Sequence, residues 1–301
     1  MAKENPTGKS GDFDPAVWPL FDKYVHGIID RRAFLKEAAK FAVGAMTAAG
    51  ILDALSPRFA EARKIKPDDA RLTASYVEIQ SPQGYGKVRA YLAKPARTIG
   101  KLPVVLVVHE NRGLNPHIED VARRMALENY IAIAPDALAP LGGYPGGEDA
   151  ARDLFQKLDQ AKTREDFRAS ALHAMALPEG NGRLGVVGFC WGGGIANFLA
   201  TRLPDLKAAV PFYGSAPDAA DVPGIKAALQ IHLAEKDDRI NAGWPAYEAA
   251  LKAAKVKYEA FVYPGAQHGF HNDTTPRYDE AAANTAWQRT LALFNKRLRS
   301  M

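Results

Sequence analysis

The sequence predicts an α/β fold in which helices cover both faces of a mostly parallel sheet. Two observations predict this fold: apolar segments of strand length recur from residue 104 onward, and helical segments lie between most of them. Uninterrupted apolar segments are typical of strands that are buried on both faces. Alternation of strands with helices is typical of a parallel sheet, because each helix returns the chain to the edge where the next strand begins.

The elements are expected in a definite order along the chain. A hairpin comes first, at residues 76–80 and 87–93, because polar and apolar residues alternate on both sides of a turn at 83–86. The buried strands are expected at residues 104–108, 130–134, 184–189, 208–213, 228–233 and 258–263. The helices are expected at residues 118–128, 164–176, 193–202, 244–254 and 278–298. Ligand-binding side chains should lie beyond the carboxyl ends of the strands.

The charge and the cysteine count exclude several classes of function. The net charge is +5, but the Lys and Arg residues are scattered rather than gathered in one stripe, so no nucleic-acid partner is expected. The 301 residues contain a single cysteine, Cys190, which excludes an internal disulfide and a zinc site built from several cysteines. The Cys190 thiol is therefore either a packing group or a group with a chemical role.

Residues 1–62 are predicted to form a separate N-terminal segment ahead of a domain at residues 63–301. Arg31-Arg32 resembles a twin-arginine export signal, and an apolar run at residues 41–55 and the sequence Ala60-Glu61-Ala62 follow it. This order predicts a periplasmic or secreted protein that the export machinery handles, with cleavage after Ala62. The alternative is a cytoplasmic protein that retains its N-terminal helices. The apolar run is too short for a membrane span, so no stable membrane anchor is expected.

The strongest motif is Gly188-Phe189-Cys190-Trp191-Gly192, which lies between a predicted strand and a predicted helix. It has the form of a G-x-S-x-G nucleophile elbow with a thiol in place of the hydroxyl. Glycines are needed there because the strand and helix backbones approach closely. The N-terminus of the following helix also stabilises a thiolate. We therefore predict that Cys190 is a nucleophile.

A cysteine nucleophile needs a base, and the base needs an acid that orients it. In α/β folds that carry such a nucleophile elbow, the chain order is nucleophile, acid, base. Asp237 follows one late predicted strand, and His268 follows the next. We predict that Asp237 is the acid and His268 the base. The alternatives are Asp238 or Glu235 as the acid and His271 as the base.

The loop at residues 109–113 follows the predicted strand at 104–108, where this fold places one donor of an oxyanion hole. The backbone N–H groups of Asn111 and Trp191 are predicted to form that hole, which stabilises the charge developing on an attacked carbonyl. Glu110 lies on the same loop, and we expect it within reach of the Cys190 sulfur.

These residues resemble those of the dienelactone hydrolase family, the carboxymethylenebutenolidases, over about residues 70–300. The family's G-x-C-x-G elbow matches residues 188–192, its acid matches Asp237, and its H-[GS]-F motif matches residues 268–270. The resemblance implies the α/β hydrolase fold and a Cys-His-Asp triad that hydrolyses lactones or small carboxylic esters.

The resemblance also assigns a role to Glu110, which matches a glutamate that interacts with the thiol in the family. That glutamate helps to form the thiolate when substrate arrives. A carboxylate beside a free thiolate would repel it, so we expect the resting Cys190 thiol to be mostly protonated.

Substrate-binding residues follow from the same resemblance, with one departure. Tyr213 belongs to a Tyr-Gly pair that lines the family's site. Asn272 stands where the family member that acts on dienelactone has an arginine for the substrate carboxylate. Arg112, Arg239 and His271 are the candidates that could replace this charge.

The leading prediction is a cysteine-dependent hydrolase of a lactone or small ester, which forms an acyl-enzyme and needs no metal or cofactor. Its partner would be the small-molecule substrate. One alternative is a non-catalytic binding protein on the same fold. The other is a metal-dependent hydrolase built from His109, Glu110, His268, His271 and Asp273, although no H-E-x-x-H pattern supports it.

Overall fold

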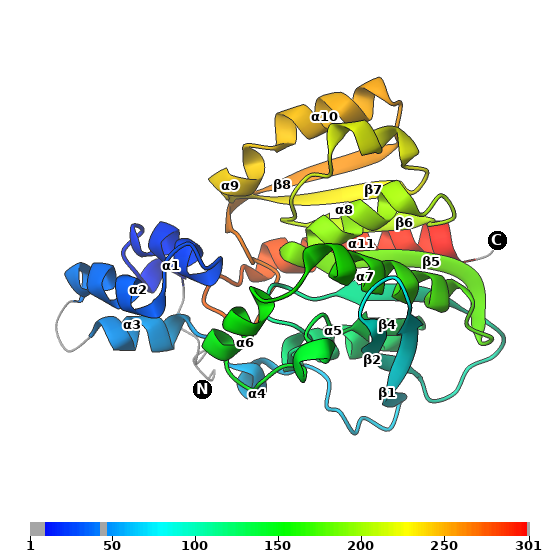
Figure 1. The fold of residues 1–301 in the computed structure, drawn as a ribbon, viewed down its shortest axis with the longest axis horizontal. Helices are drawn as coiled ribbons and strands as arrows, with labels where there is room; N and C mark the ends of the chain where they lie inside the picture. The colour runs from blue at the N-terminus through cyan, green and yellow to red at the C-terminus, as the bar shows by residue number, and fades with distance from the viewer. Residues whose placement is uncertain (1–9, 43–46, 300–301) are drawn as a thin grey trace.

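The computed structural model describes residues 10–42 and 47–299, in which eight strands form one sheet (Figure 1). The strand order across the sheet is β1-β2-β4-β3-β5-β6-β7-β8. The strands are β1 (Leu72–Ser81), β2 (Gly86–Pro95), β3 (Leu102–Val108), β4 (Ile131–Pro135), β5 (Gly180–Phe189), β6 (Ala208–Phe212), β7 (Ala228–Lys236) and β8 (Tyr258–Gln267). β2 is antiparallel to both of its neighbours, β1 and β4, and all other pairs are parallel. The predicted hairpin and mostly parallel sheet are confirmed.

Helices follow the strands as predicted. The helices of the domain are α5 (Pro116–Leu127), α6 (Glu148–Phe155), α7 (Gln160–Met175), α8 (Trp191–Arg202), α9 (Asp238–Asn241), α10 (Trp244–Ala253) and α11 (Glu280–Leu298). Short 3₁₀ helices lie at η1 (Ser10–Asp12), η2 (Ala39–Phe41), η3 (Ala139–Leu141) and η4 (Ala219–Gly224). The five predicted helices correspond to α5, α7, α8, α10 and α11, whereas α6 and α9 were not expected.

The central strands of the sheet are buried on both faces, and β3 shows this most clearly. Val104 and Leu106 pack in one apolar cluster with side chains of α7, α8 and α10. Val105 and Val107 point to the opposite face and pack in a second cluster with side chains of α5 and α11. Alternate residues of a strand face opposite sides of a sheet, so a strand between two helical layers must be apolar throughout.

The N-terminal segment forms helices with an apolar core of their own. They are α1 (Val17–Val25), α2 (Arg31–Ala38), α3 (Ala48–Leu55) and α4 (Phe59–Ala62). Phe21, Phe34 and Leu55 are buried where α1, α2 and α3 meet. Of the predicted apolar run at 41–55, residues 43–46 lie outside the described residues. Within residues 10–42 and 47–299, no helix has both the length and the hydrophobicity that a membrane span requires.

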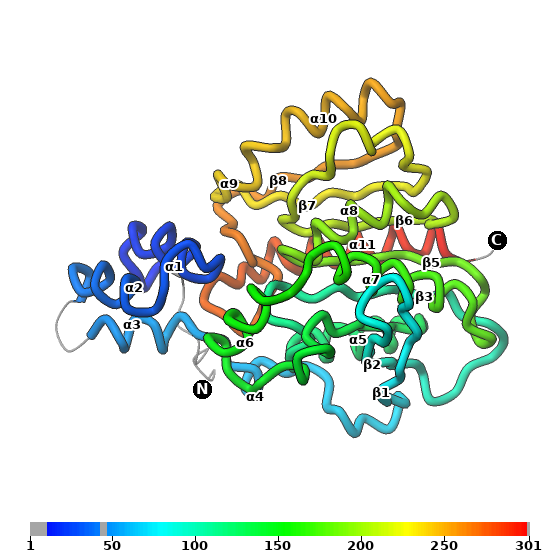
Figure 2. The backbone as a smooth tube through the Cα atoms, in the orientation of Figure 1, coloured from blue at the N-terminus to red at the C-terminus, as the bar shows by residue number. Residues whose placement is uncertain are grey.

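The N-terminal helices lie at one end of the molecule, beside α6 and α9 (Figure 1), and Figure 2 shows them as a cluster next to the main body. The carbonyl of Val25, at the end of α1, accepts hydrogen bonds from Asn111 Nδ2 at 3.0 Å and Arg112 Nη2 at 2.9 Å. Arg31 forms an ion pair with Asp149 of α6 at 3.0 Å. The segment therefore docks on the loop after β3, which carries Asn111, one of the two predicted oxyanion donors.

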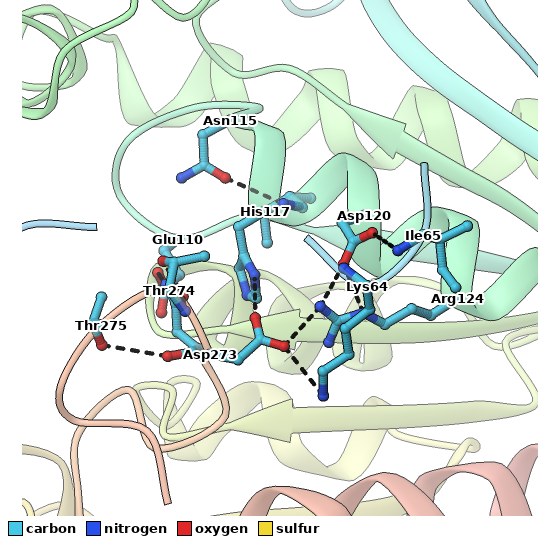
Figure 3. A network of polar contacts seen from close by, with 12 residues as sticks. Lys64, Ile65, Glu110, Asn115, His117, Asp120, Arg124, Asp273, Thr274 and Thr275 are labelled. Carbon is cyan, nitrogen blue, oxygen red and sulfur yellow. Dashed lines mark hydrogen bonds and ion pairs between the residues drawn. The ribbon is translucent and has the colours of Figure 1, made fainter. Parts of the chain in front are cut away.

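The chain between the N-terminal helices and β1 is fixed by a buried polar network. The Lys64 N–H donates to Asp120 Oδ2 of α5 at 3.2 Å. Three basic side chains surround the Asp273 carboxylate (Figure 3). Its oxygens lie 3.2 Å from His117 Nδ1, 2.7 Å from Arg124 Nη2 and 3.3 Å from Lys64 Nζ. Burial would raise the pKa of Asp273, but these three partners outweigh burial and hold it below its usual range. The network ties the loop after β8 to α5.

Candidate active site

Cys190 occupies a sharp turn between β5 and α8. Its backbone has φ 55° and ψ −116°, in a region that residues with a side chain rarely adopt. A Cβ added at Gly188 would lie 1.9 Å from the Gly192 carbonyl oxygen, and one at Gly192 would lie 2.5 Å from that of His109. Larger residues at either position would therefore open the turn, which explains the G-x-C-x-G spacing. The strand, turn and helix match the predicted elbow.

Asp237 and His268 directly follow β7 and β8, and their side chains meet beyond the ends of these strands. His268 Nδ1 lies 2.6 Å from Asp237 Oδ2, and both residues are buried. His268 Nε2 is buried without a hydrogen-bond partner among the described residues. The alternative acids differ: Asp238 is exposed on α9, and Glu235 is exposed and accepts the Gly265 N–H at 2.8 Å.

A histidine that the sequence analysis did not single out contacts the thiol. His26, at the end of α1, places Nε2 3.6 Å from Cys190 Sγ. On the other side of its ring, Nδ1 lies 2.8 Å from the Asp22 carbonyl oxygen and 3.2 Å from Asp22 Oδ1. Arg239 Nη2 lies 2.8 Å from the same His26 Nε2 and donates to it when the imidazole is neutral. The N-terminal segment thus brings a second His-Asp pair to the thiol.

The only sequence signal for His26 is the helical spacing of Val17, Phe21 and Tyr24 in the residues before it. This spacing predicts an amphipathic helix whose apolar face packs against other apolar side chains. An export signal does not need such a helix ahead of its arginines.

The two imidazoles determine the ionisation of the thiol. Burial alone would raise the pKa of Cys190, but the charge of His268 and the hydrogen bond to His26 outweigh burial and lower it to about 6. Burial would likewise lower the pKa of His268, yet Cys190 and its bond to Asp237 raise it to about 10. Both shifts favour a thiolate next to an imidazolium, the opposite of the mostly protonated thiol that the resemblance led us to expect.

This ionisation predicts the pH dependence of alkylation, which reports Cys190 alone because it is the single cysteine. Only the thiolate reacts, so the rate with iodoacetamide should fall as pH drops through about 6 and stay level above it. In His26→Ala the hydrogen bond to the thiolate is lost, so the inflection should move to higher pH. His173→Ala, an exposed position on α7, should leave it unchanged. A wild-type inflection near the free-cysteine value of about 8.5 would contradict this prediction.

A cavity of about 250 Å³ opens beside the sulfur. Its lining includes Asn111 and Trp191, the two predicted oxyanion donors, together with Tyr213. Two arginines that could face an anionic substrate, Arg152 and Arg239, also line it. The cavity therefore brings together part of the predicted site and adds one basic residue, Arg152, that the sequence analysis did not name.

Three of the predicted site residues, Glu110, Arg112 and His271, are not among the residues that line this cavity. Glu110 accepts a hydrogen bond from Asn272 Nδ2 at 2.9 Å. Arg112 is buried under the N-terminal segment, where it pairs with Glu148 at 3.5 Å. His271 lines a different cavity, of about 210 Å³.

The residues of the metal-hydrolase alternative do not come together. His109 is buried, with Nε2 accepting the Ala137 N–H at 3.0 Å, and burial lowers its pKa to about 4. Asp273 is occupied by the network described above. Among the described residues, one group of three or more histidine, cysteine or acidic side chains has metal-binding spacing: His26, Cys190 and His268.

A thiol on the turn after the central strand of this sheet, with a His-Asp pair beside it, defines an α/β hydrolase. The profile of the "Dienelactone hydrolase family" matches residues 88–298. The chain belongs to the dienelactone hydrolase family. A second profile, described as "YqhI-like", matches residues 5–42, the stretch that contains His26.

Individual relatives agree with this assignment. The chain is 36% identical over 231 residues to a "Putative carboxymethylenebutenolidase" of Synechocystis, covering 71% of this chain and 93% of the relative. It is 54% identical over 114 residues to the "Putative hydrolase fragment YghX" of Escherichia coli, covering 38% of this chain and 97% of the fragment. The crystal structure of a "Putative Dienelactone Hydrolase" from Klebsiella pneumoniae matches with a TM-score of 0.66 and 33% identity, covering 75% of this chain and 99% of that one.

Proposed function

We propose that this protein hydrolyses a lactone or small carboxylic ester through a Cys190-His268-Asp237 triad and an acyl-enzyme intermediate. One observation carries the proposal: the Cys190 thiol lies on a nucleophile turn beside the His268 imidazole. The Nδ1 atom of that imidazole, on the side away from the thiol, lies 2.6 Å from Asp237 Oδ2. The names of two relatives, each a "Putative carboxymethylenebutenolidase", support the substrate class, since a butenolide is a lactone.

In the first half of the reaction the Cys190 thiolate attacks the carbonyl carbon of the substrate. A carbon–sulfur bond forms, and the electron pair of the carbonyl moves to its oxygen. The backbone N–H groups of Asn111 and Trp191 would stabilise that oxyanion. When the intermediate collapses, the carbon–oxygen bond to the leaving group breaks, and the His268 imidazolium gives its proton to the departing oxygen.

In the second half a water molecule attacks the thioester, and the now neutral His268 accepts a proton from it. When the second tetrahedral intermediate collapses, the carbon–sulfur bond breaks, the electron pair returns to sulfur as the thiolate, and the carboxylic acid leaves. The proton taken from water remains on His268 as the imidazolium, whose orientation and charge Asp237 stabilises. For a lactone, the alcohol and the acid leave as one molecule, since the ring oxygen is the leaving group.

The experiment that tests the function is a panel of aryl esters and small lactones given to the purified full chain. We expect hydrolysis of at least one class, and loss of that activity after iodoacetamide has modified Cys190. EDTA should not inhibit, because the proposed steps use only side chains and backbone. Hydrolysis that survives complete alkylation would contradict the proposal. Tight binding of these compounds without turnover would instead favour the non-catalytic binding protein.

We also propose that the N-terminal segment directs twin-arginine export to the periplasm or the medium. Arg31 and Arg32 are exposed at the start of α2, where a receptor could reach them. Replacing both with lysine should retain the protein in the cytoplasm, as measured by fractionation and immunoblotting. N-terminal sequencing of exported wild-type protein should show cleavage after Ala62, so the exported form would keep the Cys190-His268-Asp237 triad and lack His26, which acts in the full chain alone. Equal export of the wild type and the double-lysine variant would contradict the proposal.

A further inference from the structure

Three metal-ligand atoms converge at the active site. Cys190 Sγ, one ring nitrogen of His26 and one of His268 all lie within 4.8 Å of one another, and Sγ to His26 Nε2 measures 3.6 Å. Thiolate and imidazole are the ligands that Zn²⁺ prefers. Bonds of about 2.0 Å to nitrogen and about 2.3 Å to sulfur separate two ligands of a tetrahedral Zn²⁺ ion by about 3.3–3.6 Å. Movements of about 1 Å or less would therefore complete three corners of a tetrahedron.

The outer nitrogen of each imidazole already has the partner that a zinc-binding histidine needs. His268 Nδ1 pairs with Asp237 Oδ2 at 2.6 Å, and His26 Nδ1 lies near the carbonyl and carboxylate oxygens of Asp22. Such carboxylate–histidine pairs fix the ring orientation and raise the basicity of the ligating nitrogen. Both Nε2 atoms are thereby left for a common ligand, and that of His268 is buried without a partner among the described residues.

The surroundings provide room for the fourth position, and they include two positive charges that oppose a cation, Arg152 and Arg239. The cavity of about 250 Å³ beside Cys190 can hold a water molecule or a substrate oxygen as the fourth ligand. Arg239 opposes a cation, because its Nη2 lies 2.8 Å from His26 Nε2. Its side chain is 39% exposed, so it can turn toward solvent when an ion enters.

We propose that the full chain binds one Zn²⁺ ion through Cys190, His26 and His268, with the fourth position open to the cavity. The bound ion would hold the thiolate and would join the N-terminal segment to the domain through His26. Because the bound ion would occupy the Cys190 thiolate, Zn²⁺ should reversibly inhibit ester hydrolysis. This expected inhibition rests on the proposed function. The site itself is independent of that function, since it follows from the ligand atoms alone.

Zn²⁺ affinity of the metal-stripped full chain, measured by competition with a chromophoric chelator, tests the site. We expect one Zn²⁺ per chain, and a loss of affinity of at least about 100-fold in His26→Ala, because loss of an outer-shell partner alone costs up to that factor. His26→Gln, which keeps a polar group beside Asp22, should lose a similar factor, and circular dichroism should show that both variants are folded. His173→Ala should bind as the wild type does. Arg239→Gln should bind more tightly, since a competing cation is removed.

Co²⁺ in place of Zn²⁺ provides a second, spectroscopic readout. The wild type should show thiolate-to-cobalt charge-transfer absorption, and Cys190→Ser should lose it. Failure to bind one Zn²⁺ per chain overturns the proposal, as does equal Zn²⁺ affinity in wild type and both folded His26 variants. Binding that depends on His26, in a protein that hydrolyses no ester without metal, leaves the site standing and rejects the proposed function. Hydrolysis without His26-dependent binding does the reverse.

Discussion

Cys190→Ala is expected to lower kcat/KM for a responsive ester by about 10⁴- to 10⁶-fold, the range seen when a triad nucleophile is removed. The reason is that the thiolate forms the covalent bond to the substrate, and no other nucleophile is at the tip of the turn. Steady-state hydrolysis, corrected for the uncatalysed rate, measures the effect.

The fold should survive this substitution, because alanine keeps the Cβ and removes only the sulfur. Thermal unfolding and circular dichroism of Cys190→Ala should therefore resemble those of the wild type. A folded variant that retains more than a tenth of the activity would show that Cys190 is not the nucleophile.

Asp237→Asn is expected to lower kcat/KM by about 10³- to 10⁴-fold, the effect of the corresponding change in a serine triad. Asparagine keeps the shape of the side chain and can still accept the Ile240 N–H that Asp237 Oδ1 receives at 3.4 Å. It removes the negative charge that stabilises the His268 imidazolium, and its amide can favour the wrong tautomer of the ring.

Asp238→Asn provides the matched control, because Asp238 is the neighbouring carboxylate and lies exposed on α9. We expect kcat/KM of this variant to stay within a few-fold of the wild-type value. A large loss in Asp238→Asn with little change in Asp237→Asn would move the acid to Asp238, the alternative that the sequence left open.

The elbow and its two partners could be predicted from the sequence because their signals are local. Cys190 is framed by glycines that the close approach of β5 and α8 requires. Asp237 and His268 each follow an apolar strand directly, so their positions depend only on where those strands end. The sheet was predictable for the same reason, because apolar strands leave a continuous pattern.

Other features depend on contacts between distant parts of the chain. His26 reaches the thiol only because α1 docks on the loop after β3. The residues before His26 predict a helix with one packed face, but they do not indicate where that helix docks. Glu110 pairs with Asn272, which stands where the resemblance implied an arginine. The orientation of the Glu110 side chain therefore depends on a residue 162 positions away in the sequence. The helix α6 was not predicted, because it is short and follows a glycine-rich stretch that is typical of a loop.

The ionisation of Cys190 was predicted wrongly for an electrostatic reason. The expectation placed a carboxylate, Glu110, beside the sulfur, and a carboxylate would keep the thiol protonated. The structure places two imidazoles there, and their positive charge favours the thiolate. The N-terminal segment therefore changes the chemistry of the site.

The acyl-enzyme on Cys190 can be tested most directly by peptide mass mapping of the full chain. The reaction is quenched in acid during turnover of a slowly hydrolysed activated ester. We expect an added acyl group on the peptide that contains Cys190, which appears during turnover and disappears when the substrate is consumed. Cys190→Ala should carry no such adduct. Continuing turnover with no adduct on Cys190, or with a kinetically competent adduct on another residue, would show that the reaction does not pass through an acyl group on Cys190.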